Sequence, residues 1–239
     1  FKFRRSAFVS DDPKVCLMVP STLGFSGESI AIDFSVNADT PLRSETILSE
    51  CRSVDPRVEP LVLLVRRWAR DRGIAHAAQG HLPSYAWNLL TVFFLQTASE
   101  SDVVLPPIGG KVRSEPDNVA MLRKPQKSIA ALFRELVAFY ARDFDWQREG
   151  ISVRLGCRAP PQAGLPLCYL SEAGKQLGPS IEDPFEVTRN LGSGVTWTAL
   201  TRLREELLRA DELCSRGASL KELLELWAPP VSLPADANA

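Results

Sequence analysis

Apolar residues recur at helical spacing through the middle of the chain. Between positions 56 and 72 they fall three or four residues apart, which places them on one face of an α-helix. Asp55 offers a side-chain oxygen to the start of this helix, Pro56 fits its first turn, and Gly73 favours its end. We therefore expect a helix over residues 56–72 with this apolar stripe: Val58, Leu61, Val62, Val65, Trp68 and Ala69.

The same spacing predicts further helices. Pro83 begins one that continues through Phe94, and Ser128 caps another whose stripe ends near Tyr140. Two more are expected near the end of the chain, over residues 197–214 and 219–227, where Trp197 is expected to pack into the core. The chain is therefore expected to be mainly helical from Ser44 onward.

Strand patterns are confined to short segments. Residues 14–20 and 29–36 alternate or run apolar and β-branched, which predicts two strands of one sheet. Residues 151–155 alternate as well and predict a short third strand. Two stretches rich in proline and glycine, residues 99–127 and 156–180, are expected to be loops.

These elements predict an α/β (α+β) protein in two parts. Residues 1–43 would carry the sheet and residues 44–228 the helices, while residues 229–239 show no periodicity and are expected to be disordered. The chain begins at Phe1 with residues that look like the middle of a domain. We therefore expect it to be a fragment of a longer protein.

Composition excludes several classes of protein. The net charge of −1 creates no global field for nucleic acid, so any RNA or DNA contact must be a local basic patch. The apolar runs are too short to span a bilayer, so no membrane partner is expected. The 5 cysteines include no CxxC pair. We interpret them as reduced thiols of an intracellular protein, in the cytoplasm first, with nucleus or organelle open.

The candidate chemistry lies on the first two predicted helices. Arg66 and Arg70 are one turn apart, so their guanidinium groups can share a face. Ser84 and Tyr85 follow a turn and open the next helix. Two fixed cations beside an aromatic ring suit a phosphate chain attached to a base. The alternatives are a solvated helix face and a core tyrosine with a wet hydroxyl.

Five blocks, in this order, resemble a known family. They are IAIDFSVN (30–37), VDPRVEPLVLLVRRWARDRGI (54–74), GHLPSYAWNLLTVFFLQ (80–96), SIAALFRELVAFYARDFDW with the following ISVRLG (128–156), and IEDPFEVTRNLGSGV (181–195). The chain is similar to noncanonical poly(A) polymerases and terminal uridylyltransferases, within the DNA polymerase β-like nucleotidyltransferases. The resemblance implies that residues 1–43 are the last part of a nucleotidyltransferase sheet. It also implies a helical central domain that includes a poly(A)-polymerase-associated module over about residues 128–190.

The resemblance also implies a reaction and its cofactor. Such enzymes add nucleotides to an RNA 3′ end with Mg²⁺ (or Mn²⁺) ions held by three carboxylates. Asp33 matches the third carboxylate and is both the catalytic and the metal-binding candidate. Asn37 follows it as a nucleotide-binding candidate, and a ribose-contacting asparagine of the family falls at Ser44. The Gly-Ser and Asp-x-Asp that precede the third carboxylate in the family have no match here, so we expect this stretch alone to be inactive.

The remaining matches imply a nucleotide pocket. Arg66 and Arg70 would face the triphosphate, Ser84 would donate to phosphate, and Tyr85 would stack on the base. The base pocket would contain Asp183, Glu186 and Arg189, the last at a position where some uridylyltransferases carry a histidine that disfavours adenine. The triphosphate would lie in a cleft between the sheet and the helical part.

Three functions that agree with the resemblance stay open at this point, beside an unrelated helical adaptor. The sequence of residues 181–192 favours UTP slightly. The first candidate is therefore an RNA uridylyltransferase, and the second is a poly(A) polymerase that uses ATP. A catalytically inactive RNA-processing subunit that retains the nucleotide cleft is the third. The partners implied are an RNA 3′ end and a nucleoside triphosphate.

Overall fold

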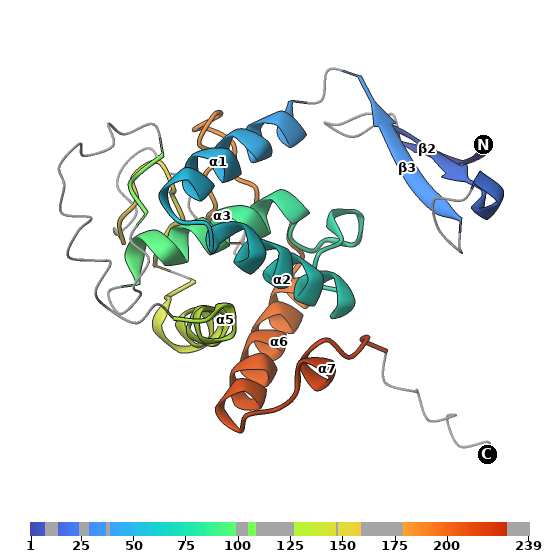
Figure 1. Cartoon of the computed structure of the whole chain (residues 1–239). Helices are drawn as coiled ribbons and strands as arrows, with labels where there is room; N and C mark the ends of the chain where they lie inside the picture. Colours follow the sequence, from blue (N-terminus) through green and yellow to red (C-terminus); the bar gives the residue numbers. More distant parts are fainter. Residues whose placement is uncertain are drawn as a thin grey trace, which may run out of the picture. The chain divides into compact units, whose positions relative to one another are not determined.

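The computed structural model describes residues 1–7, 14–23, 29–36, 39–98, 105–108, 127–146, 148–158 and 179–228. Asn37, most of the two predicted loops and the predicted tail lie outside these residues. The chain divides into two compact units, Phe1–Thr46 and Ile47–Ala239 (Figure 1). The α/β prediction is confirmed, because a small sheet is followed along the chain by helices.

The first unit contains a three-stranded antiparallel sheet in the order β1-β2-β3. Its strands are β1 (Lys2–Ala7), β2 (Lys14–Val19) and β3 (Ile30–Ser35), and a short 3₁₀ turn, η1 (Ser21–Leu23), follows β2. Strands β2 and β3 confirm the two predicted strands. Strand β1 was not predicted, because its sequence KFRRSA places two arginines in the middle where an apolar alternation would signal a strand.

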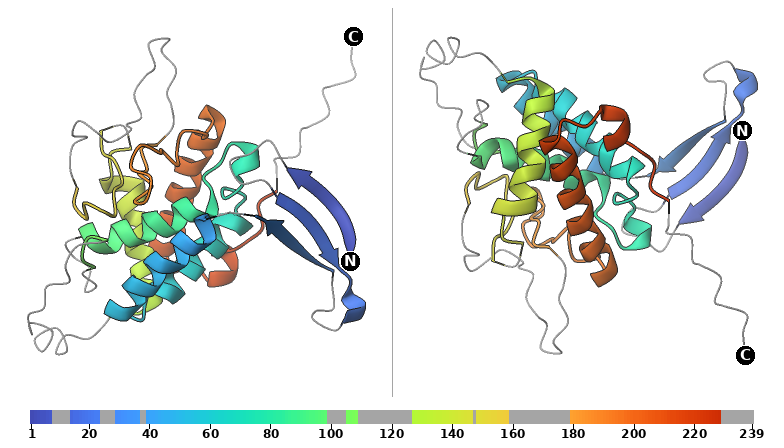
Figure 2. Two further views of the ribbon diagram at one scale, coloured as in Figure 1. Left: turned by 90° about the horizontal axis from the view of Figure 1, so that it is seen from above. Right: turned by 90° about the horizontal axis from the view of Figure 1, so that it is seen from below.

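The second unit is helical (Figures 1 and 2). Helix α1 (Thr40–Val54) leads into it from the first unit and begins four residues before Ser44. Residues Tyr85 to Leu95 of α3 are all buried, so α3 is the central helix of the unit. Helix α3 packs against α2, and α5 packs against both α2 and α6. The elements after α1 are α2 (Val58–Asp71), η2 (Ala77–Gln79), α3 (Ser84–Thr97), α5 (Ile129–Ala138), the π-helical turn η3 (Phe139–Asp143), α6 (Trp197–Ser215) and α7 (Leu220–Leu223).

Aromatic side chains join these helices. The ring of Trp68 on α2 meets Trp87 on α3 edge-to-face at 5.6 Å and Phe133 on α5 at 5.9 Å between centroids. Tyr140 donates its hydroxyl hydrogen to the Leu90 carbonyl at 2.6 Å. The predicted stripe of α2 is confirmed, because its six residues are all buried in this core.

Three predicted boundaries or elements differ from the structure. Helix α2 begins at Val58 rather than Pro56, because Asp55 accepts a hydrogen bond from the Arg57 backbone N–H at 2.8 Å and closes a turn there. The strand predicted over residues 151–155 is wrong, since Ile151 makes only an isolated bridge to Ile181 before a run of turns. The last predicted helix shortens to α7, which a Ser219 capping box begins.

The described cysteines are free thiols: Cys16, Cys51, Cys157 and Cys214. Burial, followed by the charge of Glu50, raises the pKa of Cys51 to about 12, whereas Cys157 is exposed. Because the thiolate is the reactive form, iodoacetamide at pH 8 should alkylate Cys157 in the native protein and leave Cys51 unmodified. Peptide mass spectrometry checks this, and equal labelling of the two thiols would contradict it.

Within the described ranges, no helix combines the length and apolar character needed to cross a membrane.

Candidate functional site

The predicted site residues of the first part of the chain lie on β3 and α1. Asp33 is exposed in β3 and pairs with Cys16 of β2 in the sheet register. Ser44 is half-buried in α1, and Asn37 lies outside the described residues. Among the residues with described positions, no group of three or more His, Cys, Asp and Glu side chains could hold a metal ion. Asp33 is therefore placed where a ligand could reach it.

The two candidate arginines lie on the exposed face of α2. Arg66 and Arg70 are both exposed, on the opposite side of the helix from the buried stripe. The Arg70 side chain is 63% exposed, and its Nε donates to Asp71 Oδ1 at 3.3 Å. A guanidinium held through Nε keeps its two outer nitrogens available, which is the geometry that binds phosphate oxygens.

Ser84 and Tyr85 open α3, as predicted, after Pro83 in an extended conformation. Ser84 is exposed at the first turn, where backbone N–H groups have no partner within the helix. The Tyr85 side chain, in contrast, is 6% exposed and belongs to the core of the unit. A ring that stacks on a base must present one face to the ligand. Stacking on Tyr85 therefore stays a prediction, and the burial shows that this ring also packs the core.

The turn before α3 is fixed by the start of α6. The Thr196 N–H donates to the Gly80 carbonyl at 2.9 Å. Gly80 has φ +76°, and a Cβ there would lie 2.5 Å from Thr196 Cγ2. Position 80 therefore requires glycine both for its left-handed backbone and for this close approach. Trp197, next along α6, is 63% exposed, so the expectation that it packs into the core was wrong.

The three predicted base-pocket residues come together in one loop. The Asp183 side chain is 0% exposed, and its Oδ1 accepts the Phe185 N–H at 3.0 Å. Arg189 Nη1 lies 3.6 Å from Asp183 Oδ2 and 3.9 Å from Glu186 Oε2. The Arg189 N–H also donates to the Glu186 carbonyl at 2.7 Å, which closes the loop between them. One guanidinium thus faces both carboxylates, an arrangement that the spacing of the residues alone did not reveal.

Two further residues hold this loop and were missed by sequence reasoning. Asn190 Oδ1 accepts the N–H groups of Ile181 and Gly192, both at 2.9 Å. Glu182, 2% exposed, accepts from Arg154 Nη2 at 2.6 Å. The usable signal was Asn190 itself, because asparagine in a turn often bonds backbone N–H groups near it. The loop is therefore tied together by hydrogen bonds to its own backbone and by the Arg154–Glu182 ion pair.

Gly192 is a second position in this loop that admits no side chain. A Cβ there would lie 1.8 Å from the Pro179 carbonyl oxygen, whereas a Cβ at Gly194 meets nothing within 4 Å. Gly192→Ala should lower the free energy of unfolding by about 1–3 kcal/mol through overpacking, and Gly194→Ala should change it by less than about 1 kcal/mol. Urea denaturation of both variants tests this pair. Equal stabilities would show that the loop can shift away from Pro179.

Comparisons with known proteins give consistent results. No protein-family model matches the chain. The chain is 29% identical over 200 residues to poly(A) RNA polymerase GLD2-A of Xenopus laevis, a match that covers 78% of this chain and 36% of that relative. It is 32% identical over 200 residues to the speckle targeted PIP5K1A-regulated poly(A) polymerase of Homo sapiens, with 76% and 22% covered. The chain therefore spans well under half the length of these curated relatives.

Solved structures share the fold. A cytoplasmic RNA terminal U-transferase matches with a TM-score of 0.66 and 23% identity, over 95% of this chain and 75% of that one. The Cid1 poly(U) polymerase with magnesium and 3′-dATP bound matches with a TM-score of 0.67 and 22% identity, over 95% and 72%. Another Cid1 structure contains the UTP analogue UMPNPP and matches with a TM-score of 0.66 and 23% identity, over 95% and 74%.

Proposed function

Because the chain belongs to the family of noncanonical poly(A) polymerases and terminal uridylyltransferases, we propose that the protein containing it adds nucleotides to RNA 3′ ends without a template. The observation that carries the proposal is the pair of exposed arginines one turn apart on α2, a helix that packs against α3. Two cations at this spacing suit a triphosphate. The substrates are then a nucleoside triphosphate and an RNA 3′-hydroxyl.

The chemistry needs positioning and charge more than covalent catalysis. The 3′-hydroxyl of RNA loses its proton to solvent as its oxygen bonds to the α-phosphorus. The bond from that phosphorus to the bridging oxygen breaks, and pyrophosphate leaves with the electron pair. Arg66 and Arg70 would hold the β- and γ-phosphates and stabilise the negative charge that develops on the leaving group. Ser84 would donate its hydroxyl hydrogen to a phosphate oxygen.

A divalent metal ion is part of this proposal, although the described residues do not form a complete site for one. Mg²⁺ (or Mn²⁺) would supply charge neutralisation at the reacting phosphate. Asp33 would supply one oxygen ligand, and the described residues add no cluster of three around any position. We therefore attribute the reaction to the full-length protein.

ATP is the nucleotide with more support. The curated relatives at 29–32% identity are named poly(A) polymerases. The U-transferase structures share only 22–23% identity and support the fold alone. Arg189 also stands where the family histidine that disfavours adenine is found in some uridylyltransferases. UTP is the second candidate, because the rest of the sequence of residues 181–192 resembles that of uridylyltransferases.

The loop around Arg189 offers a direct test of base choice. The guanidinium only donates hydrogen bonds and is held by Asp183 and Glu186, whereas a neutral histidine would also present an acceptor. Arg189→His should shift the incorporation ratio of full-length protein from ATP toward UTP by about 5-fold or more, equivalent to about one unsatisfied polar group. Arg148→His is the matched control, because Arg148 is exposed and pairs with Asp145 rather than with Asp183 or Glu186.

The incorporation ratio is measured with labelled RNA, Mg²⁺ and equal concentrations of ATP and UTP, for the unmodified protein and for each variant. Extension with UTP in excess over ATP by the unmodified protein would reverse the proposed nucleotide. Binding of nucleotide without any extension would support the third function, an inactive RNA-processing subunit. An unchanged ratio in Arg189→His would remove Arg189 from base choice.

A further inference from the structure

Asp71, the last residue of α2, is a buried carboxylate at an unfavourable position. Its side chain is 5% exposed, and the end of a helix carries partial negative charge that disfavours an anion. Arg67 Nε donates to Asp71 Oδ2, and Arg70 Nε donates to Oδ1 at 3.3 Å. Each carboxylate oxygen is therefore occupied by one arginine, and both arginines come from the preceding turn. A buried charge of this kind persists in a fold only when it is paired.

The bond to Arg70 fixes the direction of its guanidinium group. The Arg70 side chain is 63% exposed and the Arg67 side chain 57%, so only their inner nitrogens are engaged by Asp71. An arginine on an open helix face otherwise samples many rotamers, each of which a bound phosphate must restrict. The carboxylate restricts those rotamers before the ligand arrives.

The backbone of Asp71 is itself held by the end of the described chain. The Trp227 N–H donates to the Asp71 carbonyl at 2.9 Å. The Arg202 guanidinium lies 3.5 Å from the Trp227 ring centroid, and one of its Nη atoms donates to the Arg72 carbonyl. Residues 71 and 72 are therefore fixed from two sides, by α6 and by the segment after α7.

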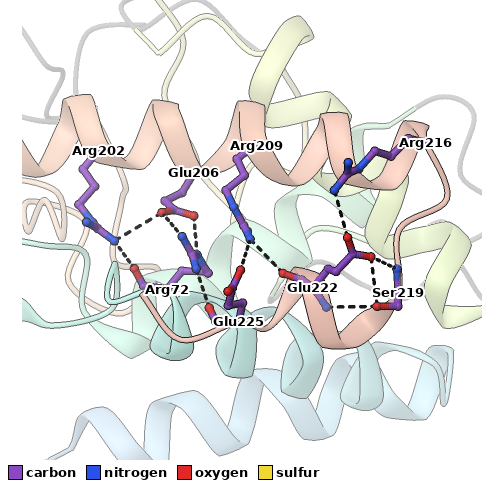
Figure 3. Close-up of polar contacts among 8 residues, drawn as sticks. All are labelled: Arg72, Arg202, Glu206, Arg209, Arg216, Ser219, Glu222 and Glu225. Carbon is purple, nitrogen blue, oxygen red and sulfur yellow. Dashed lines mark hydrogen bonds and ion pairs between the residues drawn. The ribbon is translucent and has the colours of Figure 1, made fainter. Parts of the chain in front are cut away.

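Two arginines of α6, Arg202 and Arg209, and Arg216 at its C-cap anchor that segment (Figure 3). The three are seven residues apart, so their side chains project on the same face of the helix. Arg209 lies 3.5 Å from Glu225, and Arg216 lies 3.1 Å from Glu222. Movement of this segment away from α2 would break all of these contacts.

We propose that Asp71 is a positioning residue that holds Arg70 in the orientation that receives the phosphates of the nucleotide, while its second carboxylate oxygen is occupied by Arg67. The proposal rests on the proposed function. Asp71 acts through the arginines and touches no reacting atom. The segment up to Trp227 fixes the backbone of Asp71 and so sets the position of the carboxylate to which the arginines donate.

Positioning and simple charge have opposite consequences for Asp71→Asn. This variant removes one negative charge beside the arginines, which by itself would strengthen anion binding. If Asp71 orients the arginines, the same variant instead raises the KM for nucleotide by about 3- to 10-fold and leaves kcat nearly unchanged. The direction of the change in KM therefore separates the two roles.

The experiment uses the full-length protein and two further variants. Arg70→Ala removes the phosphate contact itself, and Glu59→Gln removes a negative charge from the first turn of the same helix. KM and kcat are measured with ATP and with UTP, and binding of inorganic tripolyphosphate is measured by calorimetry. We expect weaker tripolyphosphate binding in Asp71→Asn and Arg70→Ala, and unchanged binding in Glu59→Gln.

Tighter or unchanged binding of tripolyphosphate in Asp71→Asn, with weaker binding in Arg70→Ala, would overturn the positioning role while the proposed function stands. Unchanged binding in Arg70→Ala would instead overturn the phosphate role that the proposed function gives to α2. Circular dichroism of each variant ensures that only folded proteins are compared. If Asp71→Asn does not fold, Asp71→Glu replaces it, and the same increase in KM is expected because the longer side chain displaces both guanidinium groups.

Discussion

Replacing Asp33 by alanine is expected to abolish nucleotide addition by the full-length protein. The loss should be at least about 100-fold in kcat, because removal of a charge-stabilising or metal-binding group typically costs that much or more. Asp33 is exposed on β3, so its removal leaves no cavity in the core. Gel analysis of labelled RNA with ATP or UTP measures the effect.

Asp39→Ala is the matched control for this variant. Asp39 is also an exposed aspartate of the first unit, and its carboxylate lies 3.7 Å from Arg43 on the solvent side of α1. The control should retain activity within about twofold, as surface ion pairs contribute little. Retained activity in Asp33→Ala would remove this residue from the mechanism, whereas equal loss in both variants would indicate damage to the sheet.

Replacing Glu206 by alanine is expected to cause the largest loss of stability. Glu206 is 6% exposed and accepts from Arg72 Nε at 2.7 Å and Nη2 at 2.9 Å, so the variant leaves a buried guanidinium without its partner. Breaking such a buried pair costs about 3–5 kcal/mol. Urea denaturation should show this decrease in the free energy of unfolding.

Glu212→Ala on the same helix provides the comparison, because Glu212 is exposed. Its effect should stay within about 0.5 kcal/mol. The double variant Arg72→Met/Glu206→Leu removes both charges and should recover most of the lost stability. A loss below about 1 kcal/mol in Glu206→Ala would contradict the structural role of the pair.

Elements with strong local patterns were predictable from the sequence. The stripe of α2, the Ser128 cap of α5 and the start of α3 after Pro83 all follow from residues close together in the chain. The short helix α7 ends earlier than predicted, and the segment around it makes tertiary contacts that periodicity does not encode, between Glu225 and Arg209 and between Glu222 and Arg216. Strand β1 likewise depends on pairing with β2 rather than on its own residues.

The candidate site divides in the same way. Residue types such as Arg66 and Arg70 could be selected from their spacing and the resemblance. The pairing of Arg189 with Asp183, the burial of Tyr85 and the exposure of Trp197 are results of tertiary packing, which periodicity does not encode. Asp71 was missed for the same reason, since a carboxylate among four arginines reads as a surface charge until its burial is known.

The most direct test is extension of a 5′-labelled RNA by the full-length protein with Mg²⁺ and each nucleoside triphosphate supplied separately. The proposed function predicts longer products with ATP, with UTP or with both, and none when the RNA ends in a 3′-deoxy nucleotide. An RNA that stays at its original length with every nucleotide would contradict the proposed function.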